Sequence, residues 1–330
     1  HANRALIFED VQLHSALGCI TNQPLTADEF GIHHIHAVFL TNQTEGRIAY
    51  ILHRSKQKRK IRKRYVTNLN HFGGAKILCL ICIMNSLMKG LAAGPQFILF
   101  CALTLTCVGL GTIVAMGVGT TVFAIPLEEL PGVLANPEAD HAHALIWMNN
   151  ITQIIGFGFP VIAYLLLFGT GNVHNLMLKK PGLVLFVAPI LILSATPLID
   201  ISGLMNEWLI PAGSSLEAAF KPAEELAERM TLLFLDPKTG LQPGVVFLSI
   251  AVIPAICEEL LFRGVLMPLL GKMTRNIHAA IWITAALFSL IHMQFYGFLP
   301  RLLMGAVLGY LVIWSGSLWS SMLAHFVNNA

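Results

Sequence analysis

The chain has 330 residues, of which 55% are hydrophobic and only 12% charged, and its formal net charge is +3. Soluble domains carry about 25% charged residues, and half that share leaves too little polar surface to cover a water-soluble globule of this size. The composition therefore excludes a disordered chain, a nucleic-acid scaffold and an ordinary cytosolic enzyme. With a mean hydropathy of +0.68, it predicts an all-α, polytopic bundle of transmembrane helices.

The first 87 residues differ from the rest of the chain. Residues 1–74 hold 10 Lys and Arg against 5 Asp and Glu, together with 7 of the 13 His. Eight basic side chains fall between Arg54 and Arg64, in a run that we expect to be solvated or to lie against anionic lipid. Because no helical or strand period is sustained here, we predict that residues 1–87 form a poorly ordered, basic, His-rich extension and that Met88 is the natural start.

Seven apolar segments follow, as expected for membrane helices. They are Phe97–Ile125, Ile146–Phe168, Leu183–Ile199, Val245–Leu270, Ile277–Met293, Phe298–Trp314 and Ser317–Ala330. Between the third and the fourth, residues 200–242 are more polar, and the amphipathic segment Ala218–Leu235 is predicted to lie on the membrane surface. We therefore expect N-terminal membrane helices and a surface loop in residues 88–242, and a C-terminal core in residues 243–330.

Basic residues in the short loops predict the orientation. Lys89, Lys179, Lys180, Lys272 and Arg275 fall on one side if each segment crosses once, and that side should be cytoplasmic. We expect a multi-pass protein in the plasma membrane of a prokaryote. The lipid bilayer is its expected partner, and nucleic acid is not expected to be one.

Two acids and one base interrupt the fourth segment: Glu258, Glu259 and Arg263. Ionisable groups inside a membrane cost a few kcal/mol each and normally face a cavity. Glu259 and Arg263 are four residues apart and can pair on one helix face, whereas Glu258 is rotated by about 100° and remains unneutralised. A carboxylate in a low-dielectric site binds protons more readily and suits a general base. A structural Glu–Arg clasp beside a water-filled crevice is the alternative.

Two further pairs with four-residue spacing follow. Phe288 and His292 share a face of the fifth segment, and His325 and Asn329 share a face of the seventh. With Glu258 they supply a base, imidazoles and hydrogen-bond donors for an oxyanion, which is the equipment for amide hydrolysis by activated water. The sequence has no serine-hydrolase elbow, no H-E-x-x-H zinc motif and no phosphate-binding loop.

These three motifs, in order on successive apolar segments, resemble the signature of the CAAX protease and bacteriocin-processing family. Its members are intramembrane glutamic endopeptidases similar to the type II CAAX prenyl endopeptidases. The resemblance covers about residues 243–330. It implies catalytic roles for Glu258, His292, His325 and Asn329, and structural support of the site by Glu259, Arg263 and Phe288. In these roles Glu258, assisted by His292, would activate water, while His325 and Asn329 would position the water or stabilise the oxyanion.

The resemblance also implies that no cofactor is needed. Zinc held by His292, His325 and Glu258 is the disfavoured alternative. The implied substrate is a membrane-associated peptide or protein, with or without a lipid anchor. Two other functions stay open: a non-proteolytic scaffold or bacteriocin-immunity-type membrane protein, and a proton-coupled transporter that uses Glu258 and the histidines as a relay. Relatives often continue past the position of Asn329, so we expect a chain truncated near its end.

Overall fold

The computed structural model describes residues 88, 90–168, 177–178, 182, 184–208, 210–211 and 213–330, together with four short strands before residue 67. The chain divides into two compact units. Residues 1–91 with 166–169 form the first, and residues 92–165 with 170–330 form the second. The predicted N-terminal membrane helices and the predicted C-terminal core therefore lie within one unit.

The first unit contains an antiparallel sheet with the strand order β1-β2-β3-β4. Its strands are Leu6–Phe8 (β1), Ile35–Asn42 (β2), Arg47–Arg54 (β3) and Arg64–Val66 (β4). The sequence analysis expected no strand here. However, β2 and β3 are rich in β-branched and aromatic residues, which favour extended backbone, and only four residues separate them. Most of the basic run, residues 55–63, lies outside the described residues.

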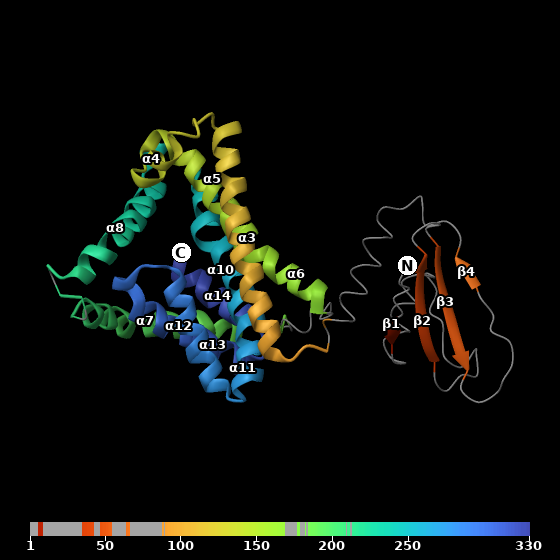
Figure 1. The fold of residues 1–330 in the computed structure, drawn as a ribbon. Helices are drawn as coiled ribbons and strands as arrows, with labels where there is room; N and C mark the ends of the chain where they lie inside the picture. Colours follow the sequence, from red (N-terminus) through yellow and green to blue (C-terminus); the bar gives the residue numbers. More distant parts are fainter. Residues whose placement is uncertain are drawn as a thin grey trace. The chain divides into compact units, whose positions relative to one another are not determined.

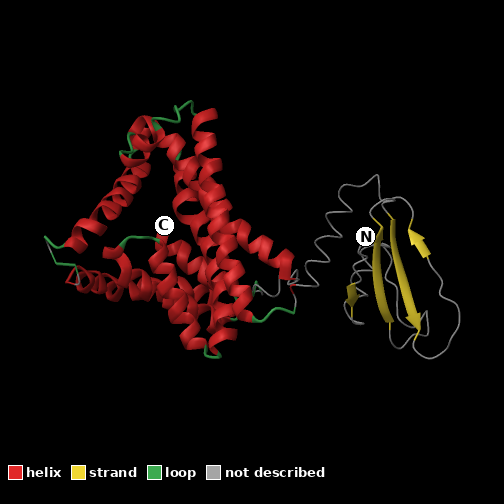
Figure 2. Cartoon of the chain, viewed as in Figure 1, coloured by secondary structure: helices red, strands yellow, loops and turns green. Residues whose placement is uncertain are grey.

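The second unit is all-α, as predicted, and the seven predicted apolar segments are helical over most of their length (Figures 1 and 2). Among the described residues, five helical stretches are long and apolar enough to cross a membrane. They are Ala93–Thr121 (α3), Ala139–Phe168, Val184–Asn206, Pro243–Thr274 and Phe295–Ser315. The third belongs to α7 (Val184–Trp208), and the last consists of η8 (Phe295–Gly297) and α13 (Phe298–Ser315). This architecture fits an integral membrane protein.

Two of the five stretches contain π-helical turns between shorter helices. The first contains η2 (Ala139–His141), α5 (Ala142–Gln153), the π-helix η3 (Ile154–Gly158) and α6 (Phe159–Phe168). The second contains α9 (Pro243–Phe247), the π-helix η6 (Leu248–Val252), α10 (Ile253–Glu259), the π-helix η7 (Leu260–Leu266) and α11 (Met267–Thr274). Short π-helical turns inside α-helices occur frequently at functional sites. The segment η7 carries Arg263, and η3 directly follows Gln153.

The other two apolar segments are shorter than a membrane is thick. The helix α12 (Ile277–Ile291) has 15 residues and α14 (Leu318–Asn329) has 12, which correspond to about 22 and 18 Å against a hydrocarbon core of about 30 Å. The expected seven membrane helices are therefore five spans and two shorter helices in the part of the chain that the structure describes. The helix α14 packs against α7, α10 and α13, and its polar residues Ser320, Ser321 and His325 are buried.

Glycine brings α3 close to the span that follows it. A Cβ atom on Gly111 would lie 3.2 Å from the Cβ of Ile155, and one on Gly156 would lie 3.1 Å from a methyl of Val108. The lack of a side chain thus permits close helix packing at Gly111, whereas the Cβ position of Gly109 has no neighbour within 4 Å. This tight contact fixes η3, and with it the end of α5.

The segment between the third and fourth spans forms α8 (Ser215–Leu235), the predicted amphipathic helix. It begins after Ser214, whose hydroxyl accepts a hydrogen bond from the backbone N–H of Glu217. The short helices α4 (Leu130–Ala135) and η5 (Pro237–Thr239) complete the unit.

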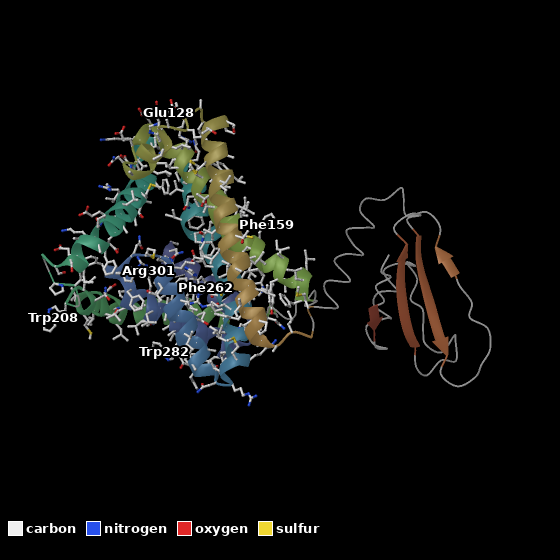
Figure 3. All side chains as sticks on the ribbon, viewed as in Figure 1. Glu128, Phe159, Trp208, Phe262, Trp282 and Arg301 are labelled. Carbon is white, nitrogen blue, oxygen red and sulfur yellow. The ribbon has the colours of Figure 1, made fainter. Side chains whose placement is uncertain are left out.

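Apolar side chains cover much of the outer surface of the helical unit. Trp208 lies at the outer end of α7, whereas Phe262 lies among the packed helices (Figure 3). Large exposed apolar residues on α3 and α7, among them Leu105 and Phe186, suit contact with lipid chains. Lys89, Lys179 and Lys180 lie outside the described residues, so the orientation stays a prediction.

Candidate active site

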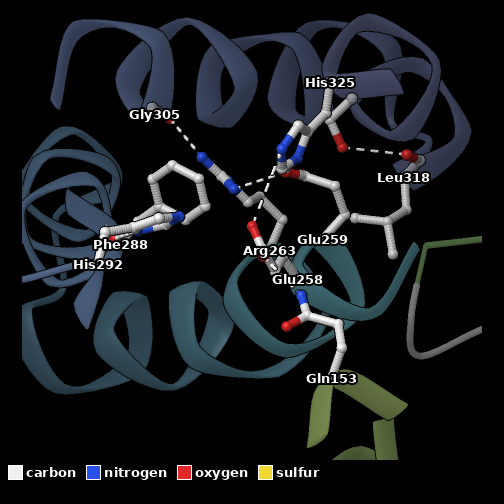
Figure 4. Close-up of polar contacts among 10 residues, drawn as sticks. Gln153, Glu258, Glu259, Arg263, Phe288, His292, Gly305, Leu318 and His325 are labelled. Atoms are coloured by element: carbon white, nitrogen blue, oxygen red, sulfur yellow. Dashed lines mark hydrogen bonds and ion pairs between the residues drawn. The ribbon is translucent and has the colours of Figure 1, made fainter. Parts of the chain in front are cut away.

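Glu259 and Arg263 form the ion pair that their spacing predicts. Nη1 of Arg263 donates to Oε1 of Glu259 at 2.6 Å, and both side chains have 0% exposed surface (Figure 4). Burying such a pair costs solvation free energy, which further hydrogen bonds must offset. Nη2 of Arg263 donates to the backbone carbonyl of Gly305 at 2.9 Å, so α13 contributes one of them.

The contact with Gly305 depends on the absence of a side chain. A Cβ atom on Gly305 would lie 3.0 Å from the Cβ of Ala285 and 3.5 Å from Nη2 of Arg263. Phe288 of α12 packs on the guanidinium, whose Cζ lies 4.8 Å from the ring centroid in a cation–π contact. A carboxylate, a carbonyl and an aromatic ring from three helices therefore hold Arg263.

Glu258 lies outside this clasp, as its helical rotation predicts. Its side chain is buried, Oε1 accepts a hydrogen bond from Nε2 of Gln153 at 2.6 Å, and Oε2 lies 3.8 Å from Nε2 of His325. Because the hydrogen bond comes from a neutral amide, it orients the carboxylate without cancelling its charge. The amide thus fixes one oxygen of the Glu258 carboxylate and leaves the other facing His325.

His325 lies between the two glutamates. Its Nδ1 is 3.0 Å from Oε1 of Glu259, and its Nε2 faces Glu258. An ionised carboxylate only accepts hydrogen bonds. Nδ1 of His325 therefore carries a proton and donates a hydrogen bond to Glu259. Nε2 is therefore the nitrogen available toward Glu258 and a substrate. The sequence analysis did not anticipate the contact with Glu259.

His292 and Asn329 are both half-buried. Nδ1 of His292 is 2.7 Å from the backbone carbonyl of Phe288, so Nε2 is the nitrogen left for chemistry. Oδ1 of Asn329, one turn beyond His325, accepts from the Asn328 amide at 3.4 Å. The Phe288 ring meets both imidazoles edge-on, at centroid distances of 4.9 Å to His292 and 5.8 Å to His325. One aromatic ring thus packs against both histidines.

The zinc alternative requires a converging set of ligands. In the part of the chain that the structure describes, no group of three or more His, Cys, Asp and Glu side chains is placed to hold a metal ion. Glu258, His292 and His325 therefore form no such group in this arrangement. Whether catalysis needs a metal stays a prediction for experiment.

Sequence analysis missed two groups of the site, the Gln153 amide and the Gly305 carbonyl. The first has a sequence signal, because a Gln inside an apolar span is costly in lipid and tends to face the protein interior. The second has none, because every residue carries a backbone carbonyl.

Comparisons with known proteins concern the C-terminal part of the chain. Residues 240–330 match the family model described as type II CAAX prenyl endopeptidase, Rce1-like, so the resemblance inferred from the motifs is confirmed over this part of the chain. The uncharacterized protein YpbD of Bacillus subtilis is 29% identical over 92 residues. The alignment covers 27% of this chain and 43% of YpbD, so the chain spans less than half of that relative's length. No solved structure matches.

Proposed function

We propose that this protein is an intramembrane endopeptidase that hydrolyses a peptide bond in a membrane-associated protein or peptide. The observation that carries the proposal is the contrast between two adjacent glutamates. Glu259 is committed to Arg263 and His325, whereas Glu258 is buried, receives a neutral hydrogen bond and faces an imidazole nitrogen at 3.8 Å. The match of residues 240–330 to a peptidase family supports the same chemistry.

In the proposed reaction, Glu258 accepts a proton from water as the water oxygen bonds to the carbonyl carbon of the scissile peptide. The carbonyl oxygen of the resulting tetrahedral intermediate is an oxyanion. When this intermediate collapses, the C–N bond breaks and the proton passes from Glu258 to the leaving amine. Glu258 is thereby regenerated as a carboxylate.

The histidines and Asn329 assist at two points. His292, with Nδ1 held by the Phe288 carbonyl, supports the activation of water through its Nε2. His325 and Asn329 supply polar contacts to the water or the oxyanion, because a fixed donor next to developing charge lowers the barrier. Glu259 orients His325, and Arg263 holds Glu259 in place.

We propose that the substrate reaches the site from the bilayer, with or without a lipid anchor. The apolar outer surface of the helical unit supports this route. The name of the matched family, type II CAAX prenyl endopeptidase, makes a prenylated C-a-a-X peptide the first substrate to test.

The test compares membranes that carry the wild type with membranes that carry Glu258→Gln. Peptide termini are identified by mass spectrometry, and a prenylated C-a-a-X peptide in lipid vesicles serves as a defined substrate for the purified protein. Because general-base catalysis contributes about 10²–10⁴-fold, Glu258→Gln should abolish the cleavage that the wild type shows. Its melting temperature in detergent should stay unchanged.

The matched control is Glu225→Gln, which changes an exposed glutamate of α8 and should cleave at the wild-type rate. A Glu258→Gln variant that keeps more than about a tenth of the wild-type rate would exclude Glu258 as the base. Identical termini in all membranes, combined with a cellular effect that survives Glu258→Gln, would instead support the scaffold function.

A further inference from the structure

The amide of Gln153 ties an N-terminal span to the proposed catalytic carboxylate. Gln153 is the last residue of α5, and its Nε2 donates to Oε1 of Glu258 at 2.6 Å (Figure 4). It lies 105 positions before Glu258 and outside residues 240–330, which the peptidase family model matches. We propose that Gln153 is a positioning residue that holds the Glu258 carboxylate in its reactive orientation. This inference rests on the proposed function.

The geometry of the carboxylate explains why such a residue is needed. The terminal torsion of a glutamate is soft, so one hydrogen bond decides where its two oxygens point. Gln153 occupies Oε1 and leaves Oε2 on the side of His325, at 3.8 Å from its Nε2. A cation in the place of Gln153 would neutralise the base, whereas the amide only orients it. The residue type therefore suits a carboxylate that has to be both fixed and charged.

The backbone beneath Gln153 is held tightly. The π-helix η3 starts at the next residue, and a Cβ on its Gly156 would lie 3.1 Å from a methyl of Val108 in α3. On another side, the Cβ position of Gly158 lies 3.7 Å from Sγ of Cys257, the residue before Glu258. Close packing against both α3 and α10 thus fixes the distance between Gln153 and Glu258. A site residue on a rigid backbone is positioned more accurately than one on a loop.

The alternative is that the Gln153 hydrogen bond only stabilises the packing of two helices and has no effect on the orientation of Glu258. Asn150, one turn earlier on α5, provides the matched comparison, because its Nδ2 donates to Oγ of Ser249 at 2.7 Å. Both amides therefore connect α5 to the Pro243–Thr274 span, but only the Gln153 amide reaches Glu258. A stabilising role alone predicts similar effects for the two residues.

The experiment measures kcat and KM for the full-length protein in lipid vesicles, with the prenylated C-a-a-X peptide as substrate. Gln153→Met keeps the side-chain length and removes the donor, and Gln153→Asn keeps the amide but withdraws it by one methylene. Each should lower kcat by about 10- to 100-fold, as expected for losing a hydrogen bond to a charged group, and should change KM by less than about twofold. Asn150→Ala should lower the melting temperature and leave kcat unchanged.

The outcomes separate this inference from the proposed function. If the wild type cleaves the peptide, Glu258→Gln does not, and a folded Gln153→Met or Gln153→Asn variant keeps the wild-type kcat, the positioning role is wrong and the proposed function stands. If Asn150→Ala lowered kcat as much as the Gln153 variants do, Gln153 would have only a stabilising role and the positioning role would be wrong. If the wild type leaves the peptide intact, or if Glu258→Gln remains active, the proposed function fails and the inference fails with it.

Discussion

The two partners of the buried ion pair should differ in how much stability their loss costs. Glu259 has a second polar partner, because Nδ1 of His325 lies 3.0 Å from its Oε1. When Glu259 is removed, Arg263 keeps no direct ion-pair partner: it retains a neutral carbonyl, an aromatic ring and the longer-range charge of Glu258. We therefore expect Glu259→Leu to be more destabilising than Arg263→Met.

The magnitudes follow from the burial of both side chains at 0% exposure. Glu259→Leu leaves a buried cation without its direct ion-pair partner, which costs about 3–5 kcal/mol. In Arg263→Met the hydrogen bond between Glu259 and His325 remains, and bonds to charged groups are worth about 1.5–3 kcal/mol, so this variant should lose only about 1–3 kcal/mol. At about 2–4 °C per kcal/mol for a unit of this size, Glu259→Leu should melt about 6–20 °C lower than the wild type.

Thermal unfolding in one detergent, followed by circular dichroism, measures this difference. The control is Lys221→Met, which breaks an ion pair of the same spacing on α8, where Lys221 is exposed to solvent and lies 3.2 Å from Glu217. It should barely change the melting temperature. Equal losses in Glu259→Leu and Arg263→Met, or a larger loss in Arg263→Met, would refute the stabilising role given to His325.

Three further predictions concern the metal, the extension and helix packing. Purified protein should hold well under one equivalent of zinc and keep its rate after chelation. If removing zinc abolished the activity and adding zinc restored it, His292 and His325 would be zinc ligands. A truncated protein that begins at Met88 should keep its expression and activity, and loss of both would show that the extension packs on the membrane helices. Gly309→Leu should lower stability by about 1–3 kcal/mol in thermal unfolding, because even a Cβ there would lie 2.9 Å from Ile281; an unchanged melting temperature would contradict close packing of α12 on α13.

Local helical geometry was sufficient for one half of the site. The pairing of Glu259 with Arg263 and the separation of Glu258 follow from positions on a single helical stretch, and the structure shows both. Composition was likewise sufficient for the all-α class and for the location of the apolar segments. Composition did not determine the number of full spans, because α12 and α14 are apolar and helical but shorter than the hydrocarbon core.

The other half required the tertiary structure. His325 was found as a histidine in an apolar helix, but its contact with Glu259 joins positions 66 residues apart, and Gln153 reaches Glu258 across 105 positions. A sequence states which residues share a helix face, because the rise and rotation per residue are constant. It does not state which faces meet, because that depends on how small residues such as Gly156 and Gly305 let whole helices approach each other.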